Sequence, residues 1–402
     1  MATPTAVRQV NESRALARLL SNGPMSRADL ARELDLTRST ASSIVASLLK
    51  AGKVLETDEP DEERANRTGR PAILLRMNAD HALFLGADIG ASYLRLCAVD
   101  FLGEMREFQE KRIEISSPDP EVLVGMLAEM VEDFAASLPD VSVIKGLNVS
   151  VPGVVNLTGD VLRAPPLGWK HVPLQRMLEE RLKPLLVTRL LNDANAFAVA
   201  ALERYGGQAL NDAVFILLED GVGGCIISDG RIIEGYQGFA GEIGHITIGG
   251  KGFCNLTGIE GALENFTARR AVLARFREQG GKADRLRDFQ ACLEEGDPVA
   301  KAVVREWAQY LGRGMAVLTT VLNPQTIILG GRVSLISPYG RSEYLSSLQS
   351  QLLPETSLPS IELSKVGPEG SAIGAALTLH KEHFELYGPM GASGQTLEIA
   401  AL

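Results

Sequence analysis

The chain has 402 residues, of which 45% are hydrophobic and 22% are charged, and its four cysteines form no CxxC pair. This composition is typical of a soluble globular protein of two or three domains and excludes disulfide-framework, fibrous and disordered classes. No apolar run reaches the roughly 18 residues of a membrane span, and residues 1–10 lack the layout of a signal peptide, so we expect a cytoplasmic protein.

The charge is distributed unevenly along the chain. The whole chain carries a net charge of −10, whereas residues 1–56 hold eight basic and five acidic side chains. A small basic segment ahead of an acidic remainder favours a DNA-binding module attached to a soluble sensor.

Residues 1–80 are expected to form the first domain, and three helices come first. Leucines at helical spacing predict a helix over residues 12–20, and Ser26 followed by Asp29 predicts the start of a second helix. A third helix begins after Thr37 and places a continuous apolar stripe on one side. Its opposite face is small and polar, and it consists of Arg38, Ser39, Ser42, Ser43 and Ser47, of which the first four are the expected DNA contacts.

This polar face suits the DNA major groove, because short hydroxyl side chains allow close approach and Arg38 can reach guanine or phosphate. For the helices alone, a three-helix adaptor with a solvated serine face is the alternative. Two short strands, at residues 54–56 and 72–75, flank a polar loop that ends in Gly69-Arg70-Pro71. An arginine held on such an extended segment fits a narrow A·T minor groove. The sequence therefore predicts a winged helix-turn-helix domain that binds DNA.

An internal repeat organises the chain from residue 81 onward. A buried strand, a glycine turn and a second strand occur over residues 83–100 and again over residues 213–230. Glycine turns expose backbone N–H groups, so two facing turns can hold phosphates from both sides. The repeat predicts an α/β body with the duplicated ribonuclease-H-like fold of the actin and sugar-kinase superfamily.

Six motifs in the same order resemble the ROK family of repressors and sugar kinases, and specifically its repressor branch. The motifs are DIGAS at 88–92, VPGVVN at 151–156, LNDANA at 191–196, GFAGEIGH at 238–245, NPQTIILGG at 323–331 and AIGAA at 372–376. Together with the winged head they cover nearly the whole chain. The resemblance implies a first lobe at 81–193 completed by a helix at 371–388, a second lobe with an oligomerisation surface at 194–370, and a tail at 389–402.

A sugar site is expected where an apolar strand, residues 185–191, gives way to a helix at Asn192 and Asp193. Amides and carboxylates there can bind adjacent sugar hydroxyls, and the helix N-terminus is expected to keep Asp193 ionised. The resemblance implies that Asp193 stands where family kinases have their base. It also implies sugar contacts for four further residues, which are Gly153, Glu242, His245 and Glu264. The alternative is that all these residues only cap and cross-link loops.

The first departure from the family pattern concerns the second phosphate turn. Family kinases have Gly-Thr where this chain has Glu219 and Asp220. Carboxylates aimed at a triphosphate cost roughly a few kcal/mol at an effective dielectric constant of about 20. We therefore expect no ATP-dependent reaction. The alternative is that both carboxylates point away or bind magnesium.

The second departure concerns the zinc site of the family, which uses three cysteines. Their positions align here with Asn255, Thr257 and Ala262, and Cys254 is one residue out of register. An amide, a hydroxyl and a methyl group cannot replace three soft thiolate ligands, so we expect neither zinc nor another cofactor. Packing around three apolar residues is expected to hold the loop instead: Phe253, Leu256 and Ile259.

The sequence thus predicts a sugar-responsive transcriptional regulator, in the first place a repressor of carbohydrate uptake or catabolism genes. Double-stranded operator DNA, a sugar or sugar derivative, and further copies of the chain in a homodimer or homotetramer are the expected partners. A ROK sugar kinase with residual activity and a DNA-bound regulator controlled by a partner protein are the alternatives. A helix over residues 297–322 is expected to be mostly core.

Overall fold

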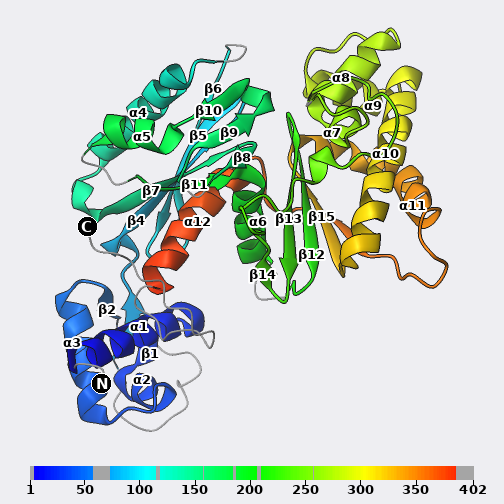
Figure 1. The fold of residues 1–402 in the computed structure, drawn as a ribbon. Coiled ribbons are helices and arrows are strands. Elements are labelled where there is room, and N and C mark those ends of the chain that lie inside the picture. Colours follow the sequence, from blue (N-terminus) through cyan, green and yellow to red (C-terminus); the bar gives the residue numbers. More distant parts are fainter. Residues whose placement is uncertain are drawn as a thin grey trace.

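The computed structural model describes residues 4–57, 73–114, 118–156, 158–183, 187–205, 210–256 and 258–385. It consists of a small N-terminal head and two lobes, coloured from blue to red along the chain in Figure 1. Gly69, Arg70, Pro71, Thr257 and the predicted tail lie outside the described residues, as do residues 386–388 of the predicted last helix. Within these ranges, no helix is long and apolar enough to cross a membrane.

The head is the predicted winged helix-turn-helix. Its elements are α1 (Pro4–Asn22), β1 (Met25–Ser26), α2 (Arg27–Glu33), α3 (Arg38–Lys50), β2 (Val54–Thr57) and β3 (Leu74–Met77). Ser26 and Asp29 form a capping box that starts α2, and the Thr37 side chain caps α3. The second wing strand was predicted to begin two residues earlier. It begins at Leu74 because this residue pairs with Thr57, the last residue of β2.

The first lobe is a mixed five-stranded sheet in the order β11-β7-β4-β5-β6. Its strands are β4 (Leu83–Ile89), β5 (Tyr93–Asp100), β6 (Met105–Arg112), β7 (Ile144–Val151) and β11 (Val187–Asn192). Helices α4 (Pro120–Ser137) and α5 (Leu174–Leu182) pack on one face, and α12 (Gly370–Glu385) packs on the other. A small antiparallel sheet stands at its edge and consists of β8 (Val154–Val155), β9 (Val161–Ala164) and β10 (Trp169–Val172).

The second lobe repeats this plan with the strand order β14-β13-β12-β15-β16. Its strands are β12 (Ala213–Leu218), β13 (Val222–Ser228), β14 (Arg231–Ile232), β15 (Thr326–Gly330) and β16 (Ser360–Leu363). Alternate residues of β12 point to opposite faces, so one set packs on α6 (Asp193–Arg204) and the other on a layer of helices. That layer contains α7 (Glu264–Thr267), α8 (Arg269–Glu278), α9 (Leu286–Glu294), α10 (Pro298–Leu322) and α11 (Arg341–Gln349). The predicted duplication is confirmed.

Short 3₁₀ helices complete the described chain and shape its loops. They are η2 (Ala79–His81), η3 (Val141–Val143), η4 (Pro165–Leu167), η5 (Ile243–His245) and η6 (Arg332–Gly340). Helix α10 is mostly core, as predicted, with Trp307 and Met315 fully buried.

Helices α6 and α12 lie between the two sheets and pack against each other (Figure 1). A Cβ atom added at Gly374 of α12 would stand 1.6 Å from the carbonyl oxygen of Ala196 in α6. On the other side of α12, a Cβ atom at Gly86 of β4 would stand 2.0 Å from the carbonyl oxygen of Ala372. Backbones that approach this closely leave room only for glycine.

The last turns of α12 reach the head. Leu379 of α12 and Phe84 and Phe101 of the first lobe belong to the same apolar cluster as Leu16 and Leu48 of the head. The ring of His380 is hydrogen-bonded at 3.2 Å to the carbonyl oxygen of Phe101. Head, first lobe and α12 therefore share one core across the predicted boundary at residue 80.

We expect Gly374→Ala to lower the free energy of unfolding by about 1–3 kcal/mol, because the added methyl group overpacks the α6–α12 contact. Gly125→Ala in α4 is the matched control, since nothing lies within 4 Å of its Cβ position and a helical glycine gains from this change. Thermal unfolding measures both variants. Equal melting temperatures for the two would contradict the close approach at Gly374.

Candidate functional site

One cleft between the lobes contains every sugar-contact residue that the sequence predicts. They are Gly153, Asn192, Asp193, Glu242, His245 and Glu264. The two glycine turns of the repeat line the same cleft. These are the β4–β5 turn, residues 90–92, and the β12–β13 turn, residues 219–221. The sequence motifs of both lobes thus meet in one place.

The side chain of Asn192 forms three hydrogen bonds within the protein. Its side-chain oxygen accepts hydrogen bonds from the backbone N–H groups of Ala194 at 2.9 Å and Asn195 at 3.1 Å, which caps α6. Its amide nitrogen donates to the carbonyl oxygen of Gly153 at 3.0 Å. Gly153 has a φ of +99°, and a Cβ atom there would stand 2.2 Å from the carbonyl oxygen of Arg163. Both residues shape the cleft wall, and their sugar contacts remain a prediction.

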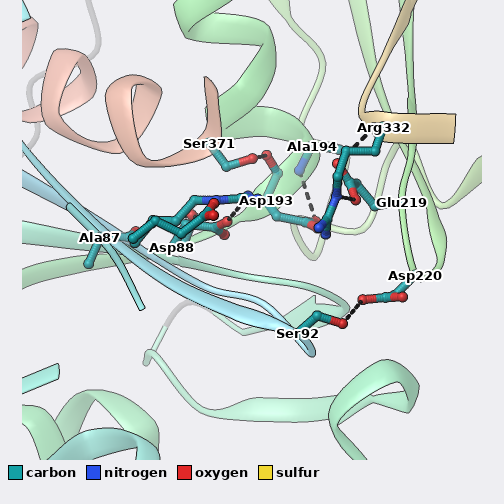
Figure 2. A network of polar contacts seen from close by, with 12 residues as sticks. Ala87, Asp88, Ser92, Asp193, Ala194, Glu219, Asp220, Arg332 and Ser371 are labelled. Atoms are coloured by element: carbon teal, nitrogen blue, oxygen red, sulfur yellow. Dashed lines mark hydrogen bonds and ion pairs between the residues drawn. The ribbon is translucent and has the colours of Figure 1, made fainter. Parts of the chain in front are cut away.

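Asp193 lies at the first position of α6, beside the buried Asp88 (Figure 2). Burial, followed by repulsion from Asp88, raises the pKa of Asp193 to about 8. The backbone N–H of Ala194, at 2.9 Å, opposes this shift only in part. The prediction that the helix N-terminus keeps Asp193 ionised is therefore wrong. The raised pKa favours the protonated form of Asp193 at neutral pH, which can donate a hydrogen bond.

Asp88 is held in place from two sides. Its carboxylate accepts hydrogen bonds from the Ser150 hydroxyl at 2.9 Å and from Arg95 at 3.2 Å. Burial nevertheless raises its pKa. Arg95 also reaches Glu110 at 2.8 Å, so the guanidinium is shared between two carboxylates.

The second-lobe side of the cleft presents three titratable groups. Glu242 and His245 approach within 3.5 Å, as their spacing predicts. Glu264 accepts a hydrogen bond from the backbone N–H of Val222 at 3.3 Å. Burial raises the pKa of Glu264 to about 7 and raises that of Glu242, whereas burial and the charge of Arg163 lower the pKa of His245. These shifts favour the uncharged forms of the three groups, which both donate and accept hydrogen bonds, as sugar hydroxyls require.

The two carboxylates of the altered phosphate turn point into the space between the turns, as Figure 2 shows. Glu219 accepts hydrogen bonds at 2.9 Å from both the backbone N–H and the side-chain Nε of Arg332. Asp220 accepts one from the Ser92 hydroxyl at 3.0 Å and forms an ion pair with Arg269. The expectation that these carboxylates repel a triphosphate stays a prediction.

Arg269 and Arg332 are the functional residues that sequence reasoning missed. No local pattern reveals them, because their carboxylate partners lie 49 and 113 residues away in the chain. Among the residues that the structure describes, no group of three or more His, Cys, Asp or Glu side chains is placed to hold a metal ion.

The loop that carries zinc in the family is held here by an asparagine. The Asn265 side chain accepts a hydrogen bond from the Leu256 N–H at 2.9 Å and donates one to the Ile259 carbonyl at 2.7 Å. Phe253 packs on Phe266 with ring centroids 5.4 Å apart, as predicted. The predicted packing role of Ile259 is wrong, since its side chain is 40% exposed and the loop is tied through its backbone.

The donor set of this loop does not fit zinc. At the aligned positions, Asn255 is used to accept a hydrogen bond from the Gly258 N–H at 2.7 Å, and Ala262 is buried and has no donor atom. Thr257 lies outside the described residues. Cys254 is the one thiol of this loop, and a structural zinc site needs four ligands of the nitrogen or sulfur type.

The predicted DNA-contact residues of α3 share one exposed face. They are Arg38, Ser39, Ser42 and Ser43. The opposite face of α3 is buried in the head through Ile44, Val45 and Leu48. The polar face is therefore available to a partner, while Gly69, Arg70 and Pro71 of the wing lie outside the described residues.

Two family matches divide the chain where the fold does. Residues 84–382 match the ROK family, and residues 8–65 match the MarR family. The xylose repressor of Caldicellulosiruptor bescii is 30% identical over 351 residues, which cover 83% of this chain and 86% of that protein.

Solved structures match both the whole chain and its body. A ROK family transcriptional regulator, described as a homologue of the Escherichia coli Mlc protein, has a TM-score of 0.73 and 27% identity. The match covers 95% of this chain and 99% of that regulator. A ROK family glucokinase from Streptomyces griseus, in complex with glucose and AMPPNP, has a TM-score of 0.65 and 26% identity. It covers 74% of this chain and 99% of the glucokinase.

We expect the free energy of unfolding of Asp193→Asn, compared with that of the wild type at the same pH, to increase as pH rises from about 4 to 8. The folded protein holds the Asp193 proton up to a pKa of about 8, whereas the unfolded chain loses it near 3.8. The stability from this group is therefore present below pH 3.8 and lost as pH rises through 8. Asparagine does not titrate and avoids this loss.

Thermal unfolding of ligand-free protein at about pH 5, 7 and 8.5 measures the difference. Asp284→Asn is the control, because that side chain is 89% exposed. If the Asp193→Asn difference stays constant with pH, Asp193 is ionised in the folded state.

Proposed function

The chain belongs to the ROK family, and we propose that it is a sugar-responsive transcriptional regulator, which binds operator DNA with its head and a sugar in its cleft. The observation that carries this proposal is helix α12, which runs from the cleft wall to the core of the head (Figure 1). At its first turn, Ser371 lines the cleft and donates a hydrogen bond to the Asp193 carbonyl at 3.0 Å. At its other end, Leu379 packs into the head.

The chemistry of the cleft supports a sugar as the effector. Its predicted contacts come from both lobes, with Gly153 and Asp193 on one side and Glu242, His245 and Glu264 on the other. A ligand that bridges the lobes favours a closed body in proportion to its differential affinity for that state. The xylose repressor among the relatives, together with the glucose-bound glucokinase, makes D-xylose and D-glucose the first sugars to test.

We propose that sugar binding releases the DNA, so that the protein acts as a repressor. Two heads in a homodimer or homotetramer would read the half-sites of an operator, whose spacing is set by the relative orientation of the heads. The second lobe offers a surface for such contacts, since it exposes large apolar side chains at Val321, Leu335, Tyr339 and Leu353. The partners of the protein are then operator DNA in the cytoplasm, a sugar and its own copies.

The proposal includes that the protein is not an enzyme and holds no cofactor. The proposal is supported by Glu219 and Asp220, which stand where the family kinases have Gly-Thr in the second phosphate turn and which are paired with Arg332 and Arg269. A triphosphate would have to displace both arginines and then face two unpaired carboxylates. The absence of zinc is supported by the donor set of this loop, in which Cys254 is the single thiol.

We expect purified protein to phosphorylate neither hexoses nor amino sugars with ATP, and we expect elemental analysis to find far less than one zinc per chain. A coupled nucleoside-diphosphate assay measures the first and mass spectrometry of metals the second, each with a ROK glucokinase as the positive control. Sustained turnover, or zinc in stoichiometric amount, would contradict the proposal.

We expect Glu242→Ala to leave DNA binding intact and to abolish its release by sugar, because the sugar that bridges the lobes loses a predicted contact on the second-lobe side. Operator binding is titrated with and without the sugar that shifts the melting temperature of the wild type. A wild-type coupling free energy of about 1–3 kcal/mol is expected. Glu260→Ala, a change at an exposed glutamate of the same lobe, is the control and should respond like the wild type. If sugar releases the Glu242→Ala protein from the operator at the concentrations that release the wild type, the effector binds outside this cleft.

A further inference from the structure

The glycine turns of the two lobes face each other across the part of the cleft where kinases of this fold bind nucleotide phosphates. In this chain the space between them contains protein side chains. Ser92, in the turn of the first lobe, donates a hydrogen bond to Asp220 in the turn of the second lobe, over 3.0 Å. The two residues are 128 positions apart in the chain, so this contact joins the lobes directly.

Arg269 completes the contact. Its guanidinium pairs with Asp220 and also donates to the Ser92 hydroxyl at 3.3 Å. The backbone N–H of Arg269 donates to the Glu219 carbonyl at 2.8 Å, which fixes the start of α8 against the turn. The Asp220 side chain is only 9% exposed and that of Arg269 is 24% exposed. Water and salt therefore screen this pair less than a surface ion pair.

A second contact between the lobes stands beside the first. Glu219 orients Arg332 through two hydrogen bonds, and the guanidinium of Arg332 lies 4.5 Å from the ring centroid of Tyr93. Tyr93 begins β5 in the first lobe. Each carboxylate that departs from the kinase pattern thus positions one arginine against the β4–β5 turn.

We propose that Ser92, Asp220 and Arg269, supported by the contact of Arg332 with Tyr93, form a latch that takes the place of the nucleotide in holding the lobes together. In a kinase of this fold, a bound nucleotide contacts both turns at once. Here the latch makes the corresponding contacts between the two turns without any ligand. It aligns the lobes so that the cleft can bind the sugar, and closure of the sugar part of the cleft is a separate step that follows binding. This inference rests on the proposed function only for its sugar-binding consequence.

The latch predicts how the sugar affinity is set. An apparent dissociation constant equals the intrinsic one divided by the fraction of molecules in the binding-competent state. A latch that keeps this fraction high makes sugar binding independent of nucleotide. Loosening the latch lowers the fraction and weakens sugar binding, although none of the latch residues is among the predicted sugar contacts.

Two variants test the latch. Arg269→Gln removes the charge that holds Asp220, and Ser92→Ala removes the hydroxyl group that links the lobes and leaves every charge in place. Arg277→Gln is the matched control, because Arg277 lies on the same helix and makes only an exposed ion pair with Asp284.

The first readout is hydrogen–deuterium exchange of the sugar-free, full-length protein. We expect Arg269→Gln to accelerate amide exchange at residues 89–94 in the first lobe, and Arg277→Gln to leave it unchanged. In Ser92→Ala we expect faster exchange at residues 219–223 of the second lobe. If both latch variants exchange these amides at the rate of the wild-type protein, the proposal is overturned. This readout needs no sugar, so it stands even if the proposed function fails.

The second readout is calorimetric titration with D-xylose or D-glucose, whichever shifts the melting temperature of the wild type. We expect the dissociation constant to rise at least threefold in both latch variants and to stay unchanged in Arg277→Gln. The exchange measurement can show loosened lobes while the dissociation constant for the sugar stays unchanged in both latch variants. That result would mean that the latch holds the lobes in an arrangement unrelated to sugar binding, and it would overturn the proposed role of the latch in sugar affinity.

Discussion

Helices α6 and α12 cross at Gly374, where the backbone of α12 lies against that of Ala196 with no room for a Cβ atom. Each helix covers one sheet, α12 that of the first lobe and α6 that of the second, so this contact joins the two halves of the body. The N-terminal ends of both helices border the cleft, through Asp193 and Ser371. A shift of one lobe relative to the other must therefore occur about this contact, because packed backbones slide or pivot more easily than they separate.

The charges of the cleft follow from the same arrangement. Bringing two copies of one fold face to face also brings together their polar turns, and carboxylates accumulate there. Arginines pair with those between the glycine turns, as Arg269 does with Asp220. Among the residues that the structure describes, neither Asp193 nor Glu264 forms an ion pair, and burial raises their pKa values to about 8 and about 7. The cleft thus has an ion-paired part between the glycine turns and a second part in which burial raises the pKa of the carboxyl groups.

Structural features that depend on neighbouring residues could be predicted from the sequence. Features that depend on contacts between residues far apart in the chain could not. Ser26 and Thr37 located the starts of α2 and α3, because a capping side chain binds the backbone three residues away. The glycine turns and their lobes followed from a repeat with a strong apolar pattern. The ionisation of Asp193 was mispredicted because its burial, and then the nearby charge of Asp88, arise only in the folded chain. Asn265 was missed because its partners are backbone groups. No sequence pattern reports which residue supplies a hydrogen bond to a loop.

The shared core of head and body determines how a signal from the cleft can travel. The head cannot rotate on the first lobe without exposing Phe84 and Phe101, both fully buried, so the head, the first lobe and α12 move together. Lobe closure then moves the second lobe relative to this unit. If copies of the chain associate through their second lobes, closure changes the orientation of one head relative to the other without any change inside a head. An operator with fixed half-site spacing would distinguish the two states. In this arrangement the sugar acts on DNA binding through the geometry of the assembly.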